Sequence, residues 1–173
     1  MIIDLRGLDE GGNTLTFEES PEELHIEDSD LELVGPIRSE VNVYKLGESL
    51  SATGHSHFRL RQACVRCLEP FEEDLSAEYT FVLQKGRPNS FSGDEDETLI
   101  WLDDEGDQVD LGAEAKDYLL LEIPVKPLCR EDCAGLCAVC GANLNQESCS
   151  CEVNSTDPRW DALRGLMGQQ EGQ

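Results

Sequence analysis

Apolar and polar residues alternate through much of residues 31–83, and this period of two predicts the strands of an antiparallel β-sheet. The alternation is clearest over residues 71–83, where acidic and small polar residues separate the apolar ones. The apolar members of this stretch are Phe71, Leu75, Ala77, Tyr79, Phe81 and Leu83. An alternation of this length is typical of a strand that buries one face and exposes the other.

Two further strands are expected earlier in the same region. The apolar residues of the first again share one parity, and they are Leu31, Leu33, Ile37, Val41 and Val43. The second covers residues 49–63, and we expect Gly54 to break it, because glycine weakens the interior of a strand. The segment CVRC, residues 64–67, then lies at the turn that joins the second and third strands, where a metal-binding knuckle fits.

The chain beyond residue 83 predicts a loop, a short β-hairpin and two helices. Residues 84–97 are rich in Gly, Ser, Pro and acids and predict an exposed loop, and residues 97–111 predict a strand, a turn at Asp104–Gly106 and a short return strand. Asp110 is expected to cap a helix that runs to about Glu122, before Pro124 ends it. A second, short helix is expected over residues 157–167.

These elements predict an α+β fold in two parts. Residues 1–125 form an antiparallel β-sheet domain with one packed helix, and residues 126–173 form a cysteine-rich, zinc-stapled segment that ends in the short helix. The first residues lack the apolar run of a secretory signal, and no stretch approaches the roughly 20 apolar residues that span a bilayer. We therefore expect a cytoplasmic protein that is not bound to a membrane, in a compartment that keeps thiols reduced.

The eight cysteines come in closely spaced pairs, which in a reducing compartment indicate metal binding before disulfides. Structural zinc takes four thiolates per ion, so eight cysteines suit two zinc ions. We favour a grouping in which one site comprises Cys137, Cys140, Cys149 and Cys151 and the other Cys64, Cys67, Cys129 and Cys133. An alternative grouping joins Cys129, Cys133, Cys137 and Cys140 and leaves CVRC with the CSC of residues 149–151.

Neither grouping leaves the open coordination position that a catalytic zinc ion keeps for water or substrate, which favours a structural role for the metal. His55 and His57 alternate along a strand and share a face, where they are either solvated residues or a pair of ligands or pH-responsive groups. Arg59, Arg61 and Arg66 form a local basic cluster, which either balances neighbouring acids or contacts a phosphate or an acidic partner.

The net charge of −24 changes the choice of partner, and most of the excess acid lies in residues 1–125. Affinity for nucleic acid depends largely on Lys and Arg that neutralise phosphates, so this surface disfavours direct binding of RNA. A basic protein is the better electrostatic match.

Four segments of the chain together resemble one family, the YceD-like large ribosomal RNA subunit accumulation proteins. These segments are CVRCLEPFEEDL, DLGAEAKDYLLLEIPVKPLC, REDCAGLCAVCGANLNQESCSC and DPRWDALRGL, and the resemblance covers about residues 30–167. It implies a ribosome biogenesis factor that supports accumulation of large-subunit (23S) rRNA, and it implies no enzymatic activity.

Charge and resemblance together predict a non-catalytic factor that binds a basic protein partner, such as a ribosomal protein or an rRNA-processing factor. Two other classes stay open: a thiol redox or zinc-dependent enzyme, and a module that binds a small ligand near Arg59, Arg61 and Arg66. An enzyme of either kind would need a reactive thiol or an open metal site.

Overall fold

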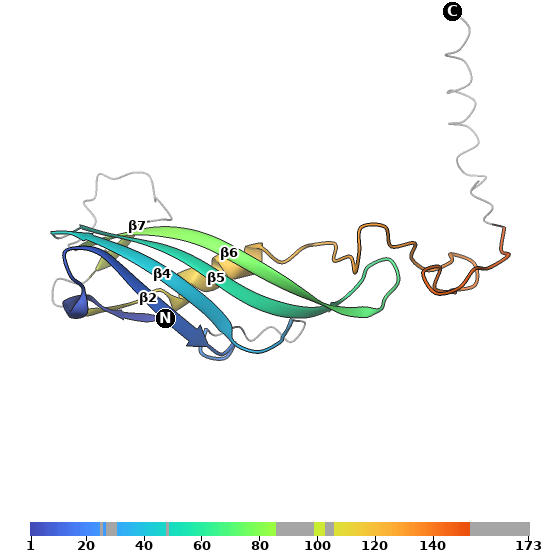
Figure 1. Ribbon diagram of the computed structural model, residues 1–173, viewed down its shortest axis with the longest axis horizontal. Helices are drawn as coiled ribbons and strands as arrows, with labels where there is room; N and C mark the ends of the chain where they lie inside the picture. The colour runs from blue at the N-terminus through green and yellow to red at the C-terminus, as the bar shows by residue number, and fades with distance from the viewer. Residues whose placement is uncertain (25, 27–30, 48, 86–98, 103–105, 153–173) are drawn as a thin grey trace, which may run out of the picture. The chain divides into compact units, whose positions relative to one another are not determined.

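The computed structural model describes residues 1–24, 26, 31–47, 49–85, 99–102 and 106–152 (Figure 1). The chain divides into two compact units. The sheet unit comprises Met1–Cys64 and Glu69–Cys129, and the cysteine-rich unit comprises Val65–Leu68 together with the residues from Arg130 onward. Within the described residues, no helix has both the length and the apolar character needed to cross a membrane.

The sheet unit is built on a sheet with the strand order β2-β4-β5-β6-β7 (Figure 1). The bounds are Gly11–Glu19 for β2, Ile37–Leu46 for β4, Ser49–Ala63 for β5, Pro70–Lys85 for β6 and Leu99–Leu102 for β7. A two-residue strand, β3 (Glu32–Leu33), also pairs with β5. All of these neighbours are antiparallel except β6 and β7, which are parallel, so the predicted antiparallel sheet is confirmed for its main strands.

Strand β6 shows the alternation that its sequence predicts. Ala77, Tyr79, Phe81 and Leu83 are buried, Phe71 and Leu75 are partly buried, and the residues between them from Glu72 to Val82 are mostly exposed. The inner face of β4 follows the same rule through Ile37, Val41 and Val43. Apolar burial on one face therefore sets the register of these strands.

The prediction that Gly54 breaks the second strand is wrong, because β5 runs without interruption from Ser49 to Ala63. Gly54 lies directly opposite Tyr79 of β6. A Cβ atom added at residue 54 would lie 1.9 Å from Cε2 of Tyr79, so the tyrosine ring occupies the space that a side chain would need. The glycine therefore makes room for an aromatic neighbour on the next strand.

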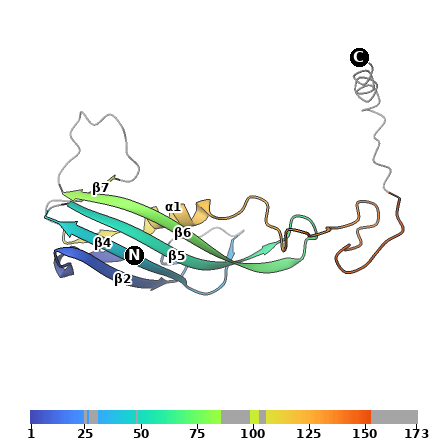
Figure 2. The same ribbon diagram turned by 45° about the horizontal axis from the view of Figure 1, so that its top comes forward.

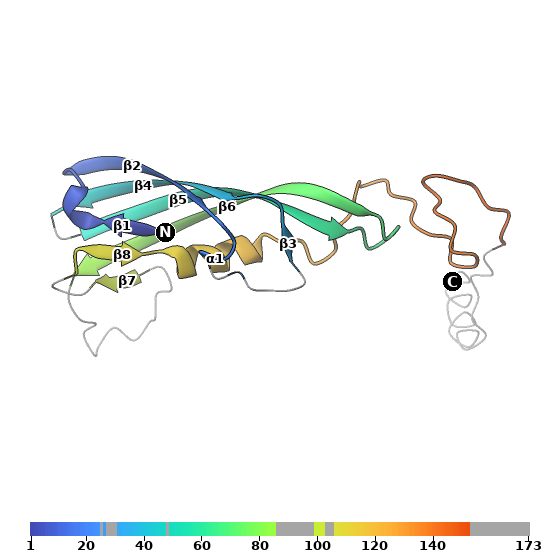
Figure 3. The same ribbon diagram turned by 90° about the horizontal axis from the view of Figure 1, so that it is seen from below.

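A second layer covers the inner face of the sheet (Figures 2 and 3). It contains β1 (Ile2–Asp4), the 3₁₀-helix η1 (Leu5–Gly7), β8 (Gln108–Asp110) and the helix α1 (Gly112–Leu121). Strands β1 and β8 pair with each other in a separate two-stranded sheet. The return strand predicted after β7 therefore exists as β8, but the predicted hairpin is wrong because the two strands belong to different sheets.

Helix α1 forms where the sequence predicts it and buries Ala115 and Leu119 against the sheet. Its N-cap position is occupied by Leu111 rather than by Asp110, which is a correction of one residue. The Asp110 carboxylate still accepts a hydrogen bond from the Gly112 N–H at 2.9 Å. It therefore satisfies a backbone donor at the start of the helix, although it precedes the N-cap residue by one position. The loop predicted over residues 84–97 starts later than expected, because Gln84 and Lys85 still belong to β6. Its remaining residues, 86–97, and the predicted second helix of residues 157–167 lie outside the described residues.

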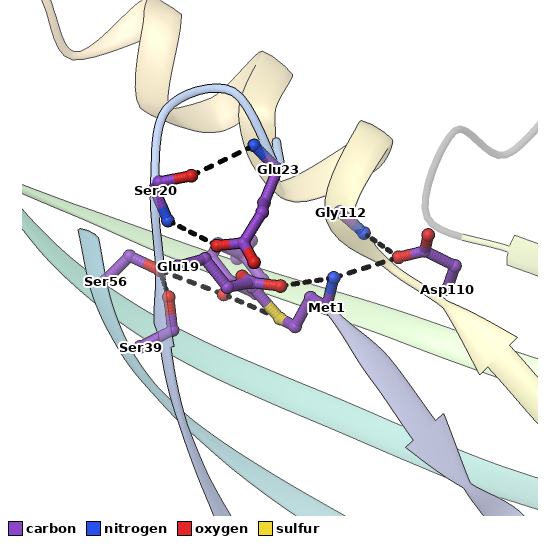
Figure 4. Close-up of polar contacts among 9 residues, drawn as sticks. Met1, Glu19, Ser20, Glu23, Ser39, Ser56, Asp110 and Gly112 are labelled. Carbon is purple, nitrogen blue, oxygen red and sulfur yellow. Dashed lines mark hydrogen bonds and ion pairs between the residues drawn. The ribbon is translucent and has the colours of Figure 1, made fainter. Parts of the chain in front are cut away.

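The amino group of Met1 joins the two layers through ion pairs with Glu19 and with Asp110 (Figure 4). Burial by itself lowers the pKa of this amine, but hydrogen bonds to the two carboxylates outweigh it and raise the pKa above the usual 8.0. Beside it, the Tyr79 hydroxyl donates to Sδ of Met1 at 3.7 Å and shares a hydrogen bond of 3.0 Å with Ser56. The core under the sheet thus includes a buried polar cluster, in which one carboxylate oxygen of Glu19, Oε2, is left without a hydrogen-bond partner.

Candidate metal centres

The structure gathers the eight cysteines into two groups of four. One group comprises Cys64, Cys67, Cys129 and Cys133, and the other comprises Cys137, Cys140, Cys149 and Cys151. This is the first of the two groupings considered from the sequence. In each group the four Sγ atoms lie within 4.8 Å of one another.

These distances suit a zinc ion. A tetrahedron with Zn–S bonds of about 2.3 Å places its sulfur atoms about 3.8 Å apart, so only a small contraction of each group is needed. The donor set is four soft sulfur atoms without histidine or carboxylate, which favours Zn²⁺ over the hard ions Mg²⁺ and Ca²⁺. Both groups could therefore hold a soft divalent metal ion in a closed site.

A local turn positions Cys137 and Cys140, two of the four cysteines of the second group. The N–H of Cys137 donates to the carbonyl of Ala142 at 2.8 Å, and the N–H of Gly141 donates to the carbonyl of Cys137 at 2.9 Å. Gly141 adopts a φ of 77°, a left-handed conformation that favours glycine. This knuckle brings Cys137 and Cys140 to the same side of the turn, as a shared metal ion requires.

The electrostatics of this group call for a cation. Backbone N–H groups of Cys140 and Val139 donate to the Cys137 sulfur and lower the pKa of that thiol from 9.0 to about 6. The hydrogen bond to Cys140, burial and the negative charge of the neighbouring sulfur atoms raise the pKa of Cys151 to about 12. Without a metal ion, deprotonation of Cys137 is thus favoured, whereas deprotonation of Cys151 is strongly disfavoured. A divalent cation removes this obstacle, because it attracts all four thiolates.

Arg66 fixes the knuckle of CVRC within the cysteine-rich unit. Its guanidinium donates to the carbonyl oxygens of Glu131 at 3.1 Å and Cys133 at 3.0 Å. Its own carbonyl accepts from the N–H of Leu136 at 2.9 Å. Gly135 is required beside it, because a Cβ there would lie 3.0 Å from the Arg66 carbonyl oxygen and φ at Gly135 is 76°.

Asn145 is a site residue that sequence reasoning missed. Its side-chain amide donates to Sγ of Cys133 at 3.4 Å, and its side-chain oxygen accepts from the N–H of Ala134 at 2.8 Å and from Arg130 at 2.6 Å. A hydrogen bond to a thiolate orients it and stabilises its charge, which is how residues outside the ligand set tune a metal site. Asparagine is so common in turns that its sequence context carries no signal of this role.

The basic cluster predicted near CVRC balances acidic neighbours. Arg59 contacts Asp74 at 2.7 Å, and Arg61 contacts both Glu72 at 2.7 Å and Glu32 at 2.6 Å. Each of these arginines has its pKa raised, chiefly by a hydrogen bond to a carboxylate. With Arg66 directed to carbonyl oxygens as well, the three guanidinium groups are engaged within the protein.

The histidines lie on the exposed face of the sheet. His55 contacts Glu78 at 3.2 Å, and the rings of His55 and His57 meet edge to face with centroids 4.7 Å apart. An open groove over β2, β4 and β5 includes both rings together with Arg38 and Glu40. In the part of the chain that the structure describes, neither histidine belongs to a group that converges on a metal position.

Comparisons with known proteins give one consistent result. The family profile of the large ribosomal RNA subunit accumulation protein YceD matches residues 52–167. A protein of Arabidopsis thaliana, the chloroplastic homologue 1 of that accumulation protein, is 30% identical over 82% of this chain and 47% of its own length. An uncharacterized protein of Mycobacterium tuberculosis is 30% identical over 75% of this chain and 61% of its own length.

The chloroplastic homologue 1 of Zea mays is 26% identical over 68% of this chain and 49% of its own length. The chain therefore spans about half to three fifths of the length of these relatives. No solved structure gives a significant match.

Proposed function

Because the chain belongs to the YceD family of large ribosomal RNA subunit accumulation proteins, we propose that it is a non-catalytic ribosome biogenesis factor. In this proposal it supports accumulation of large-subunit (23S) rRNA in the cytoplasm by binding a basic protein partner. The partner is a ribosomal protein or an rRNA-processing factor. The name of the Arabidopsis thaliana relative supports the link to large-subunit rRNA.

The observation that carries the choice of a protein partner is the state of the arginines in a chain with a net charge of −24. Arg59 and Arg61 are paired with carboxylates and Nη1 of Arg66 with backbone carbonyls, so these three cations already have partners within the protein and are less free to neutralise a phosphate. Binding to RNA depends on such free cations. A Lys- and Arg-rich protein surface is instead attracted by the excess acid, which also speeds its encounter with the chain.

The two cysteine groups fit a structural rather than a catalytic role in this proposal. The residues that would hold zinc are the four thiols of each group, and zinc coordinated by four thiolates has no position left for water or substrate. Bound metal would order the turns that carry the cysteines, since a site of this kind converts binding energy into folding energy.

Binding of the metal-loaded full chain to two purified probes tests the proposal. One probe is the total protein extracted from large ribosomal subunits, and the other is deproteinised 23S rRNA. We expect the chain to retain one or a few basic proteins, identified by mass spectrometry, and to leave the rRNA unbound at 150 mM salt. An unrelated acidic protein of similar size and net charge is the control for nonspecific attraction.

Two results would contradict the proposal. Salt-sensitive binding of protein-free 23S rRNA would show direct recognition of RNA. Retention of the same basic proteins by the acidic control would show that charge alone explains the binding. In cells, loss of the chain is expected to lower 23S rRNA relative to 16S rRNA, and an unchanged ratio would reject the biogenesis role.

A further inference from the structure

The turn of the first knuckle holds a leucine in an unfavourable backbone conformation. Leu68, which directly follows Cys67, has a φ of 60° and is the one non-glycine residue with a positive φ among the residues that the structure describes. This left-handed region costs free energy for residues that have a Cβ, and a bulky side chain there is an outlier. A structure keeps such a residue when its side chain has a use.

The second knuckle shows that the turn itself does not require leucine. There the residue after the second cysteine of CAVC is Gly141, with a φ of 77°, which is the residue that this conformation favours. Leu68 occupies the same position relative to CVRC. Glycine at residue 68 would therefore make the same turn at lower cost.

Packing within the protein does not explain the leucine either. The Leu68 side chain is 65% exposed, and Val65 on the same knuckle is 50% exposed. Two branched apolar side chains thus stand in solvent on one four-residue turn, while the buried residues of the knuckle are Cys64 and Cys67. The strain serves a side chain that contacts little of its own chain.

We infer that Val65 and Leu68, here called the knuckle tip, form the apolar anchor through which this protein binds a basic protein segment. The inference rests on the proposed function and adds the place of contact to it. The partner segment that fits the knuckle tip has an apolar residue flanked by Lys or Arg. Neighbouring exposed apolar residues that are rimmed by polar ones mark sites of interaction with other proteins.

Charge around the knuckle tip selects this partner over the alternatives. With a divalent metal ion bound, the four thiolates of the group that contains Cys64 and Cys67 would carry a net charge of −2, and these two cysteines are the sequence neighbours of Val65 and Leu68. The one cation of the knuckle, Arg66, is turned back onto the carbonyls of Glu131 and Cys133. The charge of −2 exceeds the single positive charge of Arg66, so phosphate would meet net negative charge here, whereas Lys or Arg beside an apolar residue would be attracted.

A photo-crosslinking amino acid at position 68 identifies what covers the tip. The metal-loaded chain is irradiated with the total protein of large ribosomal subunits and, separately, with deproteinised 23S rRNA. The inference expects a crosslink to a Lys- and Arg-rich protein, mapped to an apolar residue within a basic segment. A crosslink to residues 153–173 of the same chain, to a second copy, or to rRNA overturns it, as does the absence of any crosslink.

Substitution of Leu68 separates binding from folding. Leu68→Gly is expected to raise the thermal midpoint by about 2–4 °C, because the backbone strain is relieved, and to weaken binding of the crosslinked protein at least about tenfold. Leu68→Met keeps an apolar side chain and is expected to bind within about threefold of the parent. Val125→Ser, at an apolar residue that is 94% exposed outside the knuckle, is the matched control and should bind normally.

The outcomes distinguish this inference from the proposed function. Retention of basic ribosomal proteins by the parent chain with equal affinity in Leu68→Gly would reject the knuckle tip and leave the proposed function standing. Absence of any retained protein with the parent chain would reject both. A lower thermal midpoint in Leu68→Gly would show that leucine is there for stability and would overturn the inference.

Discussion

Replacing Gly54 by alanine tests whether the aromatic ring opposite it determines the sequence of β5. A Cβ at residue 54 would lie 1.9 Å from Cε2, 2.3 Å from Cζ and 2.7 Å from Cδ2 of Tyr79. Ordinary carbon contacts lie near 3.5–4.0 Å, so one methyl group cannot coexist with the ring in its present place. Either the ring leaves its site or β5 and β6 move apart.

Both responses cost free energy, and these costs set the expected loss of stability. The Tyr79 ring is 3% exposed and packs against Phe81 and Tyr118 with centroids 5.4 and 5.9 Å away. Expulsion of a buried aromatic ring costs about 3–5 kcal/mol, and strain from overpacking costs about 1–3 kcal/mol. The gain from replacing a strand glycine by alanine is only about 0.5–1 kcal/mol. We therefore expect Gly54→Ala to destabilise the fold by about 2–4 kcal/mol.

Urea unfolding followed by far-ultraviolet circular dichroism, with zinc held in excess, measures this change. A double-mutant cycle with Tyr79→Leu assigns the cause, because the shorter side chain vacates the ring position. In the Tyr79→Leu background, Gly54→Ala should be neutral or slightly stabilising. An equal loss of stability in both backgrounds, or an increase in the parent chain, would refute the role given to the ring.

Three further predictions follow from the site and the core. Asn145→Asp is expected to lower the affinity of the first cysteine group for zinc about 10–100-fold, since a carboxylate would replace the amide that donates to Cys133, and competition with a chelator measures it. Protein purified without chelator should contain two zinc ions per chain and Cys151→Ser about one; two ions in the variant would contradict the assigned ligands. Burial raises the pKa of Tyr79 above 10.0, so its contribution to stability is complete below pH 10 and is lost as pH rises through the raised value. Absorbance at 295 nm should show one tyrosine of the folded protein titrating late, and Tyr79→Phe should remove that phase.

The strands that bury one face were predictable because their pattern is local. Every second residue from Leu75 to Leu83 is apolar, and the helix near Ala115 carries its own start and stop signals. Which strand pairs with which was harder to predict from the sequence. The segments of β7 and β8 each predict a strand, but neither shows that one pairs with β6 and the other with β1.

Errors arose where a distant residue compensates for a local one. Gly54 weakens a strand by itself, and the ring of Tyr79 that fills its place comes from the next strand. Strand β2 was missed because its apolar residues are few, with Leu15 and Phe17 set among polar ones. The cysteines were found through their spacing, whereas Asn145 acts through a hydrogen bond across twelve residues and leaves no pattern in the sequence.

The pairing of β1 with β8 has a consequence for how the protein emerges during translation. Ile3 lies opposite Val109, so the first strand lacks its partner until more than a hundred further residues have been made. At about 5–20 residues per second, this delay is roughly 5–20 s. During that time Leu5 and Leu8, which belong to the final core, are without part of their cover. The nascent chain therefore presents an apolar N-terminal segment that a chaperone is able to hold, and the sheet unit closes only when β8 arrives.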